Sequence, residues 1–172
     1  KNPVFLLNGK VINLAGVVGG LETSCSADTK TALIECAFFK PEAIIGKSVK
    51  YDIQSEASYK FERFVDPECQ DRTIRRFIKI VDEHTNIKNM SIISYKFKQN
   101  KVTKIPINTN KINQIIGINI SQESYLSYLS QLGFIIDDEH VEPPSYRSDI
   151  KTQNDLAEEI ARVIGYDNIR NE

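Results

Sequence analysis

Four acidic residues near the end of the chain have the spacing of a cation-binding cluster. Asp155, Glu158 and Glu159 stand at i, i+3 and i+4, positions that share one face of a helix. Asp149 lies just before that helix, close enough to fold over its first turn. Converging carboxylates repel one another unless a cation lies between them, and Mg²⁺ takes such oxygen ligands. Spacing alone favours the alternative, a solvated acidic face partly neutralised by Arg162, which stands at i+4 from Glu158.

A second candidate site involves a glutamate in an apolar run. Glu35 stands within TALIECAFF, residues 31–39, which we interpret as a buried strand. An unpaired carboxylate there is costly, so Glu35 faces solvent, pairs with an arginine, or waits in a pocket for a donor from a ligand. Gly19 and Gly20 should form a tight turn or allow a close backbone approach, and their N–H groups could bind a ligand oxygen, although a plain turn is the commoner outcome.

Composition excludes several classes of protein. Of 172 residues, 41% are apolar and 26% charged, as in a soluble globular chain, and the net charge of −1 lacks the basic excess of a free-standing nucleic-acid binder. No stretch reaches the roughly 20 apolar residues that span a bilayer. Cys25, Cys36 and Cys69 lack a CxxC spacing and fit reduced thiols in the cytoplasm. His84 and His140 lack ligand-like neighbours, so we expect no zinc site.

The elements that must position these residues begin with a hairpin. Apolar runs at 4–7 and 10–18 flank Asn8-Gly9, a pair typical of a hairpin turn. A helix is predicted over 41–53, starting with a proline. The segment 55–65 fits both a short helix capped by Ser55 and a strand, and we favour the strand.

A longer helix should follow, starting at Asp66-Pro67 and ending near Thr85. Its apolar stripe contains Ile74, Phe77, Ile78 and Val81. The helix also carries a basic stripe, for which a solvated face is the usual explanation and contact with RNA backbone the alternative. The basic stripe consists of Arg72, Arg75, Arg76 and Lys79.

The composition changes near Lys101, and we place a domain boundary around 98–104, with strands at 91–97 and 101–107 on either side. Beyond it we expect two helices, at 109–116 and from Ser121 to Gly133, then a β ribbon, then a helix from the capping pair Thr152/Asp155 to Gly165. The predicted fold is α+β: a portion of a mixed α/β domain over residues 1–100, and a small winged-helix-like α+β domain over 101–172.

Several separated motifs resemble the β subunit of bacterial phenylalanyl-tRNA synthetases, in the order and spacing of that family. They are LAGVVGG at 14–20, ECAFF at 35–39, SEASYKFERFVDP at 55–67, and PSYRSDI with DLAEEIARVIGYDNI within 144–169. The resemblance implies that residues 1–100 are the C-terminal part of the editing domain and that 101–172 are the small domain after it. It also implies a cytoplasmic enzyme, with no membrane or DNA partner.

The resemblance further implies partners and chemistry. The family enzyme is an (αβ)₂ tetramer that attaches phenylalanine to tRNA(Phe) with ATP and Mg²⁺, and its editing domain hydrolyses tyrosine attached by mistake. Its pocket glutamate falls on Glu35, its pocket glycine on Gly19, beside Gly20, its threonine on Ser55 and its alanine on Ala57. Its Mg²⁺ site, shared with the α subunit, falls on Asp149, Asp155, Glu158 and Glu159.

Three positions depart from the family pattern: Phe64 replaces a glycine, Ser55 a threonine and Lys60 an arginine. The family's pocket histidine and its catalytic-like and anticodon-binding modules have no counterpart here, so we expect the isolated chain not to aminoacylate tRNA. The competing interpretation is a non-catalytic scaffold or nucleic-acid-binding module with the same fold.

Overall fold

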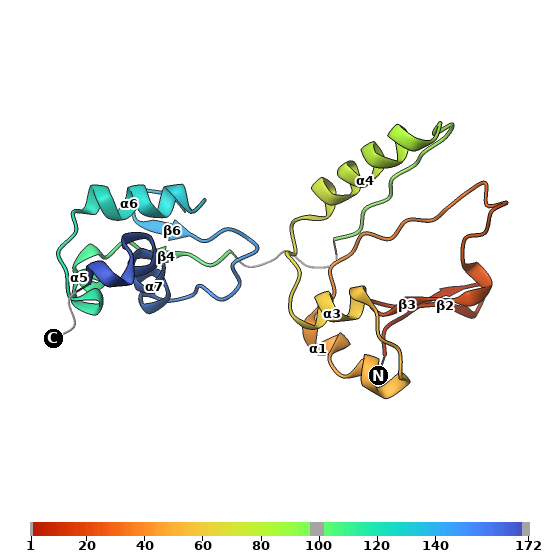
Figure 1. Ribbon diagram of the computed structural model, residues 1–172, viewed down its shortest axis with the longest axis horizontal. Helices are drawn as coiled ribbons and strands as arrows, with labels where there is room; N and C mark the ends of the chain where they lie inside the picture. Colours follow the sequence, from red (N-terminus) through yellow and green to blue (C-terminus); the bar gives the residue numbers. More distant parts are fainter. Residues whose placement is uncertain (1, 97–101, 170–172) are drawn as a thin grey trace. The chain divides into compact units, whose positions relative to one another are not determined.

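A computed structural model describes residues 2–96 and 102–169, and the chain divides into two compact units, Lys1–Ile92 and Ile93–Glu172 (Figure 1). Most of the boundary predicted at 98–104 lies in 97–101, outside the described residues. Within the two described ranges, no helix is both long enough and apolar enough to cross a membrane.

The first unit starts with an antiparallel sheet of order β1-β2-β3. Its strands are β1 (Val4–Leu7), β2 (Lys10–Leu14) and β3 (Val18–Gly19). Asn8 and Gly9 connect β1 to β2 with φ of 49° and 78°, the left-handed pair that a two-residue hairpin turn requires. The predicted hairpin is therefore confirmed.

Strand β1 forms an edge of this sheet and carries apolar side chains into solvent. It pairs with β2 on one side only. Leu6 is 61% exposed, and Val4, Phe5 and Leu7 are exposed as well. The sheet therefore presents apolar side chains that the described residues cover only in part.

Among the described residues, the first unit continues with four short helices and one longer one: η1 (Leu21–Thr23), α1 (Pro41–Ile44), α2 (Lys47–Tyr51), α3 (Glu56–Glu62) and the longer α4 (Gln70–His84). The helix predicted over 41–53 is found as α1 and α2, because Gly46 turns the chain between them with φ of 75°. Helix α4 ends at His84, capped by Thr85 and close to the predicted end, but begins at Gln70. Asp66 instead closes a turn, in which its Oδ1 accepts from the N–H of Glu68 at 2.9 Å.

The strand favoured over 55–65 is wrong, because a capping box starts helix α3 there. The Ser55 Oγ accepts from the N–H of Ser58 at 3.0 Å, and the Ser58 Oγ accepts from the N–H of Ser55 at 3.2 Å. These bonds satisfy backbone donors that have no partner within the helix. The cap therefore decides the structure of this segment, in spite of the strand-like alternate spacing of Tyr59, Phe61 and Arg63.

The buried strand predicted over 31–39 is also wrong. The segment has no regular structure, and Leu33 is 90% exposed. A strand is stable only when a neighbour completes its hydrogen bonds, and no strand among the described residues pairs with this segment. The strand predicted at 91–97 is absent over 91–96 for the same reason, and residue 97 lies outside the described residues.

The core of the first unit is small and gathers around Ile44. Ala15, Val17 and Ile44 are buried, and Gly16 lies against Ile44 with φ of 69°. A Cβ on Gly16 would lie 2.8 Å from the Ile44 Cδ1 atom, so the turn between β2 and β3 has room only for glycine. The ring of Phe39 adds edge contacts to Phe5 and Phe61, with centroids 6.4 and 5.0 Å apart.

The second unit is an α+β domain with a larger core. Its elements are β4 (Ile105–Pro106), α5 (Thr109–Ile116), α6 (Gln122–Gln131), β5 (Ile135–Ile136), β6 (His140–Glu142), α7 (Gln153–Ile164) and η2 (Tyr166–Asn168). The strands form an antiparallel sheet of order β4-β6-β5. The β5–β6 ribbon is as predicted, whereas the strand predicted at 101–107 is reduced to β4, with residue 101 outside the described residues.

Side-chain caps fix the helices of the second unit where the sequence predicts them. Ser121 and Thr152 accept hydrogen bonds from the first turns of α6 and α7, and Asn108 does the same for α5. The helices bury side chains that are fully enclosed, among them Ile112, Tyr125, Leu129, Leu156 and Ile160. Helix α7 packs against both α5 and α6, so its acidic residues are held on a rigid element.

Phe64 provides a test of backbone strain in the first unit. Its φ of 86° is a left-handed conformation that a side chain disfavours, and its ring lies 6.0 Å from that of Phe38. We predict that Phe64→Gly will be more stable than Phe64→Ala by about 1 kcal/mol, because both variants lose the ring contact and only glycine tolerates this φ. Urea unfolding of the two variants measures the difference. Equal stabilities would contradict a strained turn.

Candidate functional sites: the acidic cluster on α7 and the Glu35 segment

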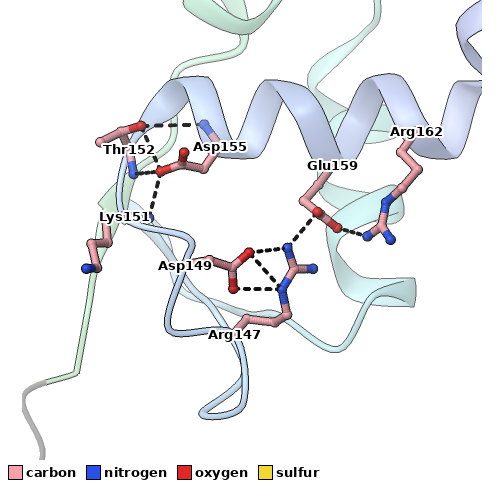
Figure 2. A network of polar contacts seen from close by, with 7 residues as sticks. All are labelled: Arg147, Asp149, Lys151, Thr152, Asp155, Glu159 and Arg162. Carbon is pink, nitrogen blue, oxygen red and sulfur yellow. Dashed lines mark hydrogen bonds and ion pairs between the residues drawn. The ribbon is translucent and has the colours of Figure 1, made fainter. Parts of the chain in front are cut away.

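The first predicted metal ligand, Asp155, caps helix α7. Its Oδ2 accepts from the N–H of Lys151 at 2.9 Å and from both the N–H and the Oγ1 of Thr152 at 2.8 Å (Figure 2). The Thr152 Oγ1 in turn accepts from the N–H of Asp155, completing a capping box. The Lys151 N–H, followed by the Thr152 hydroxyl, lowers the pKa of Asp155. Asp155 thus has a structural task that needs no metal ion.

Glu159 is the one buried carboxylate of the cluster, with a side chain only 5% exposed. Both of its oxygens accept from arginines: Oε1 from the Arg147 Nη2 at 2.7 Å, and Oε2 from Arg162. The pKa of Glu159 is lowered, chiefly by the hydrogen bond from Arg147 and against the effect of burial. The predicted pairing of Arg162 with Glu158 is therefore wrong, since Arg162 reaches Glu159, one position nearer.

Arg147 also holds Asp149. Its Nε lies 3.0 Å from the Asp149 Oδ1 and its Nη2 lies 2.7 Å from Oδ2, so one guanidinium bridges two carboxylates (Figure 2). The hydrogen bond from Arg147 is the main reason that the pKa of Asp149 is lowered, and the two carboxylates in turn raise the pKa of Arg147. Glu158 is exposed on α7 and takes no part in this network.

This arrangement does not fit a divalent cation held by all four predicted ligands. Mg²⁺ requires free oxygen lone pairs directed at a common centre. The oxygens of Asp149 and Glu159 accept from guanidinium groups, and the Asp155 Oδ2 is committed to the cap. Among the described residues, no group of three or more acidic, histidine or cysteine side chains could hold a metal ion.

The second candidate site is built around Glu35, which lies on the irregular segment before α1. Its Oε2 accepts from the Asn13 Nδ2 at 3.1 Å. Although Glu35 is exposed as a residue, its surroundings partly desolvate the carboxylate and raise its pKa, while the bond from Asn13 acts in the opposite direction. A carboxylate in this state gains from a further hydrogen-bond donor.

Asn13 places Glu35 next to the predicted glycine. It lies on β2 directly opposite Gly19 on β3, so the residue that binds Glu35 is the cross-strand neighbour of the predicted glycine. Sequence reasoning missed Asn13. The available signal was an amide side chain in the otherwise apolar run from Val11 to Val18. Its Oδ1 is buried and has no partner among the described residues.

Ser55 connects the first turn of α3 to the turn between β2 and β3, just before Gly19. Its Oγ donates to the carbonyl oxygen of Val17 at 2.5 Å. Ala57 follows in the same turn of α3, and both residues are half-buried. Ser55 and Gly19 are therefore brought to one end of the sheet, but no hydrogen bond joins Glu35 to Ser55 within the described ranges.

Gly20 has a structural role. Its N–H donates to the carbonyl oxygen of Ile12 at 2.7 Å and is thereby engaged within the chain. A Cβ at this position would lie 2.9 Å from the same oxygen. Close backbone approach therefore explains Gly20, whereas the space around Gly19 is open.

The basic stripe on α4 is solvent-exposed at all four of its positions. Arg75 pairs with Asp71, its Nε lying 2.8 Å from the carboxylate. The apolar residues Ile74, Ile78 and Val81 occupy another face of α4 and are half-buried. The stripe thus remains a candidate contact for a polyanion.

The second unit should lose stability in acid. The pKa values of Asp149, Asp155 and Glu159 lie below their ordinary values of 3.8 and 4.5, so these groups release protons more readily in the folded state than in the unfolded one. These groups stabilise the folded state at pH values above their ordinary pKa values. This stabilisation is lost as the pH falls through their lowered, folded-state pKa values. We predict that Asp155→Asn will flatten this acid dependence in urea unfolding at stepped pH.

The matched control is Glu123→Gln, which changes an acid in the first turn of α6 and should keep the acid dependence of the parent chain. An Asp155→Asn variant with the same slope as the parent would show that the cap carries no pH-dependent stability.

Comparison with known proteins gives a match in each unit. Residues 1–86 match the B3/4 domain family, and residues 105–166 match the tRNA synthetase B5 domain family. The match to the B3/4 domain includes Asn13, Glu35, Ser55 and α4, and the match to the B5 domain includes Arg147 and α7.

Among curated proteins, the chain is similar to several phenylalanine–tRNA ligase β subunits. It is 33% identical to that of Methylococcus capsulatus over 166 residues, covering 93% of the chain and 21% of the relative. It is 34% identical to that of Ehrlichia canis over 170 residues, covering 95% and 21%. The chain thus spans about one fifth of the length of these relatives. It belongs to the phenylalanine–tRNA ligase β-subunit family, in which it comprises a B3/4 segment followed by a B5 segment.

Proposed function

We propose that the first unit is part of a tRNA-editing site that hydrolyses tyrosine wrongly attached to tRNA(Phe). The observation that carries this proposal is that the Glu35 carboxylate accepts a hydrogen bond from Asn13, the cross-strand neighbour of Gly19. Partial desolvation also raises the pKa of Glu35. Ser55 and Ala57 approach the same end of the sheet through the bond from Ser55 to Val17. The family membership of residues 1–86 supports the assignment.

Selectivity in this proposal comes from one hydrogen bond. The phenol of tyrosine donates its O–H to Glu35, and phenylalanine has no such donor. When phenylalanine enters a site built around that bond, the carboxylate keeps only its donor from Asn13 and lacks the donor from the ligand, and a missing hydrogen bond at such a site is penalised. The small side chain of Ala57 leaves room for the aromatic ring. The water that attacks the ester is then placed by the pocket and by the end of the tRNA.

For the second unit we propose contact with the α subunit of an (αβ)₂ phenylalanine–tRNA ligase that works in the cytoplasm. In that assembly, tRNA(Phe) and ATP are substrates of the complete enzyme and Mg²⁺ is required for its reaction. The match of residues 105–166 to the B5 domain supports this placement. No step is assigned to Mg²⁺ at Asp149, Asp155, Glu158 and Glu159, because their arrangement does not fit the ion.

The test of the editing proposal is Glu35→Ala in the assembled αβ enzyme. We predict that the preference for hydrolysing Tyr-tRNA over Phe-tRNA, taken as the ratio of kcat/KM values, will fall by about tenfold or more. Asn13→Ala should reduce the same ratio by a smaller factor, because Glu35 loses its positioning partner but keeps its charge.

Glu42→Ala is the matched control, since it removes an exposed glutamate from α1 in the same unit and should leave the ratio unchanged. An unchanged ratio in Glu35→Ala would remove Glu35 from the editing site.

A non-catalytic RNA-binding role is the alternative, and the exposed basic stripe on α4 favours it. An assay of Tyr-tRNA hydrolysis and RNA binding by the full β subunit, with the α subunit present, distinguishes editing from non-catalytic RNA binding. Turnover of mischarged Tyr-tRNA supports editing, whereas RNA binding that weakens steeply with salt and occurs without turnover supports the alternative.

A further inference from the structure

We propose that Arg147 is the resident cation of the acidic cluster, taking the place between Asp149 and Glu159 that a divalent metal ion would need. The family resemblance predicts metal ligands at these positions, and the side chains are instead satisfied by arginine. The inference concerns a positioning residue of the second unit and is independent of the editing site.

The first step of the argument is the burial of Glu159. A carboxylate with 5% of its side chain exposed is strongly disfavoured unless it is paired and hydrogen-bonded. Arg147 and Arg162 supply both requirements, one to each oxygen. Two cations, Arg147 and Arg162, thus balance the charges of Glu159 and Asp149, so this pair of carboxylates has no excess negative charge for a metal ion to neutralise.

The second step is the geometry of the guanidinium. Arg147 is itself largely enclosed, with 24% of its side chain exposed, and its N–H groups point toward both carboxylates (Figure 2). Its Nη2 lies 2.7 Å from an oxygen of Asp149 and 2.7 Å from an oxygen of Glu159. A metal ion that ligated these two carboxylates would have to displace this nitrogen.

The third step is the mechanical role. Arg147 lies in the loop that precedes α7, and Glu159 lies in the second half of that helix. The ion pair therefore ties the loop to the helix twelve positions further on. The capping box of Thr152 and Asp155 ties the same loop to the first turn. The loop is thus fixed at two points by groups of the chain itself.

Hydrogen exchange in the assembled αβ enzyme tests the proposal without relying on activity. The readout is amide exchange over 145–152 and the first turn of α7. In the parent enzyme we predict the same protection in excess Mg²⁺ as in a chelator. In Arg147→Gln, exchange should speed up by about tenfold or more, because the buried Glu159 loses one of its partners. Added Mg²⁺ should restore part of the protection in that variant, since the position is then vacant.

Lys104→Gln is the matched control, because it removes an exposed ion pair with Asp137 in the same unit and should leave exchange over 145–152 unchanged. Arg147→Lys should restore less than full protection, because an ammonium cannot bridge two carboxylates in a planar fork. Loss of protection in the parent enzyme on chelation would overturn the proposal, and this arm needs no variant to fold.

A second measurement counts metal ions directly. With Mn²⁺ as the probe and no ATP present, the parent enzyme and Asp149→Asn should bind the same number of ions per β subunit. The loss of one Mn²⁺ per β subunit in Asp149→Asn would show that Asp149 is a metal ligand and would overturn the proposal.

Discussion

The second unit depends on keeping one carboxylate charged inside its core. Glu159 lies on the same helix as Leu156 and Ile160, which are fully enclosed, so α7 cannot pack without burying an acid. The energetic penalty is removed only because Arg147 and Arg162 approach from two directions. The course of the loop before α7 follows from this requirement, since it must return far enough for Arg147 to reach the helix.

In the first unit, the candidate site residues are also held by side-chain contacts, but these are single hydrogen bonds rather than ion pairs. The hydroxyl of Ser55 joins helix α3 to the strand turn at Val17, and the amide of Asn13 joins the Glu35 segment to the sheet. Each of these two contacts is a single hydrogen bond from a neutral donor on a half-buried side chain. The arrangement of Glu35 and Ser55 therefore rests on hydrogen bonds rather than on a deep apolar core, and the close approach of Gly16 to Ile44 is one of the few tightly packed points of the first unit.

How much the sequence predicts depends on whether the signal is local. Caps at Ser121 and Thr152 and the left-handed turn at Asn8-Gly9 act within a few residues, and the predicted elements appear there. The strand at 31–39 fails because strands require a distant partner that apolar composition does not reveal. The spacing of Asp155, Glu158 and Glu159 correctly places them on one helix. It cannot show that Arg147, outside that helix, reaches Glu159 first.

Strand β1 has a consequence for any work with this polypeptide in isolation. Its outer backbone groups have no neighbouring strand among the described residues, and its side chains Val4, Phe5 and Leu6 remain partly exposed. An exposed edge strand without charged side chains can pair with strands of other molecules, and such pairing leads to aggregation. Preparations of the separate polypeptide therefore benefit from low concentration or from a solubilising fusion.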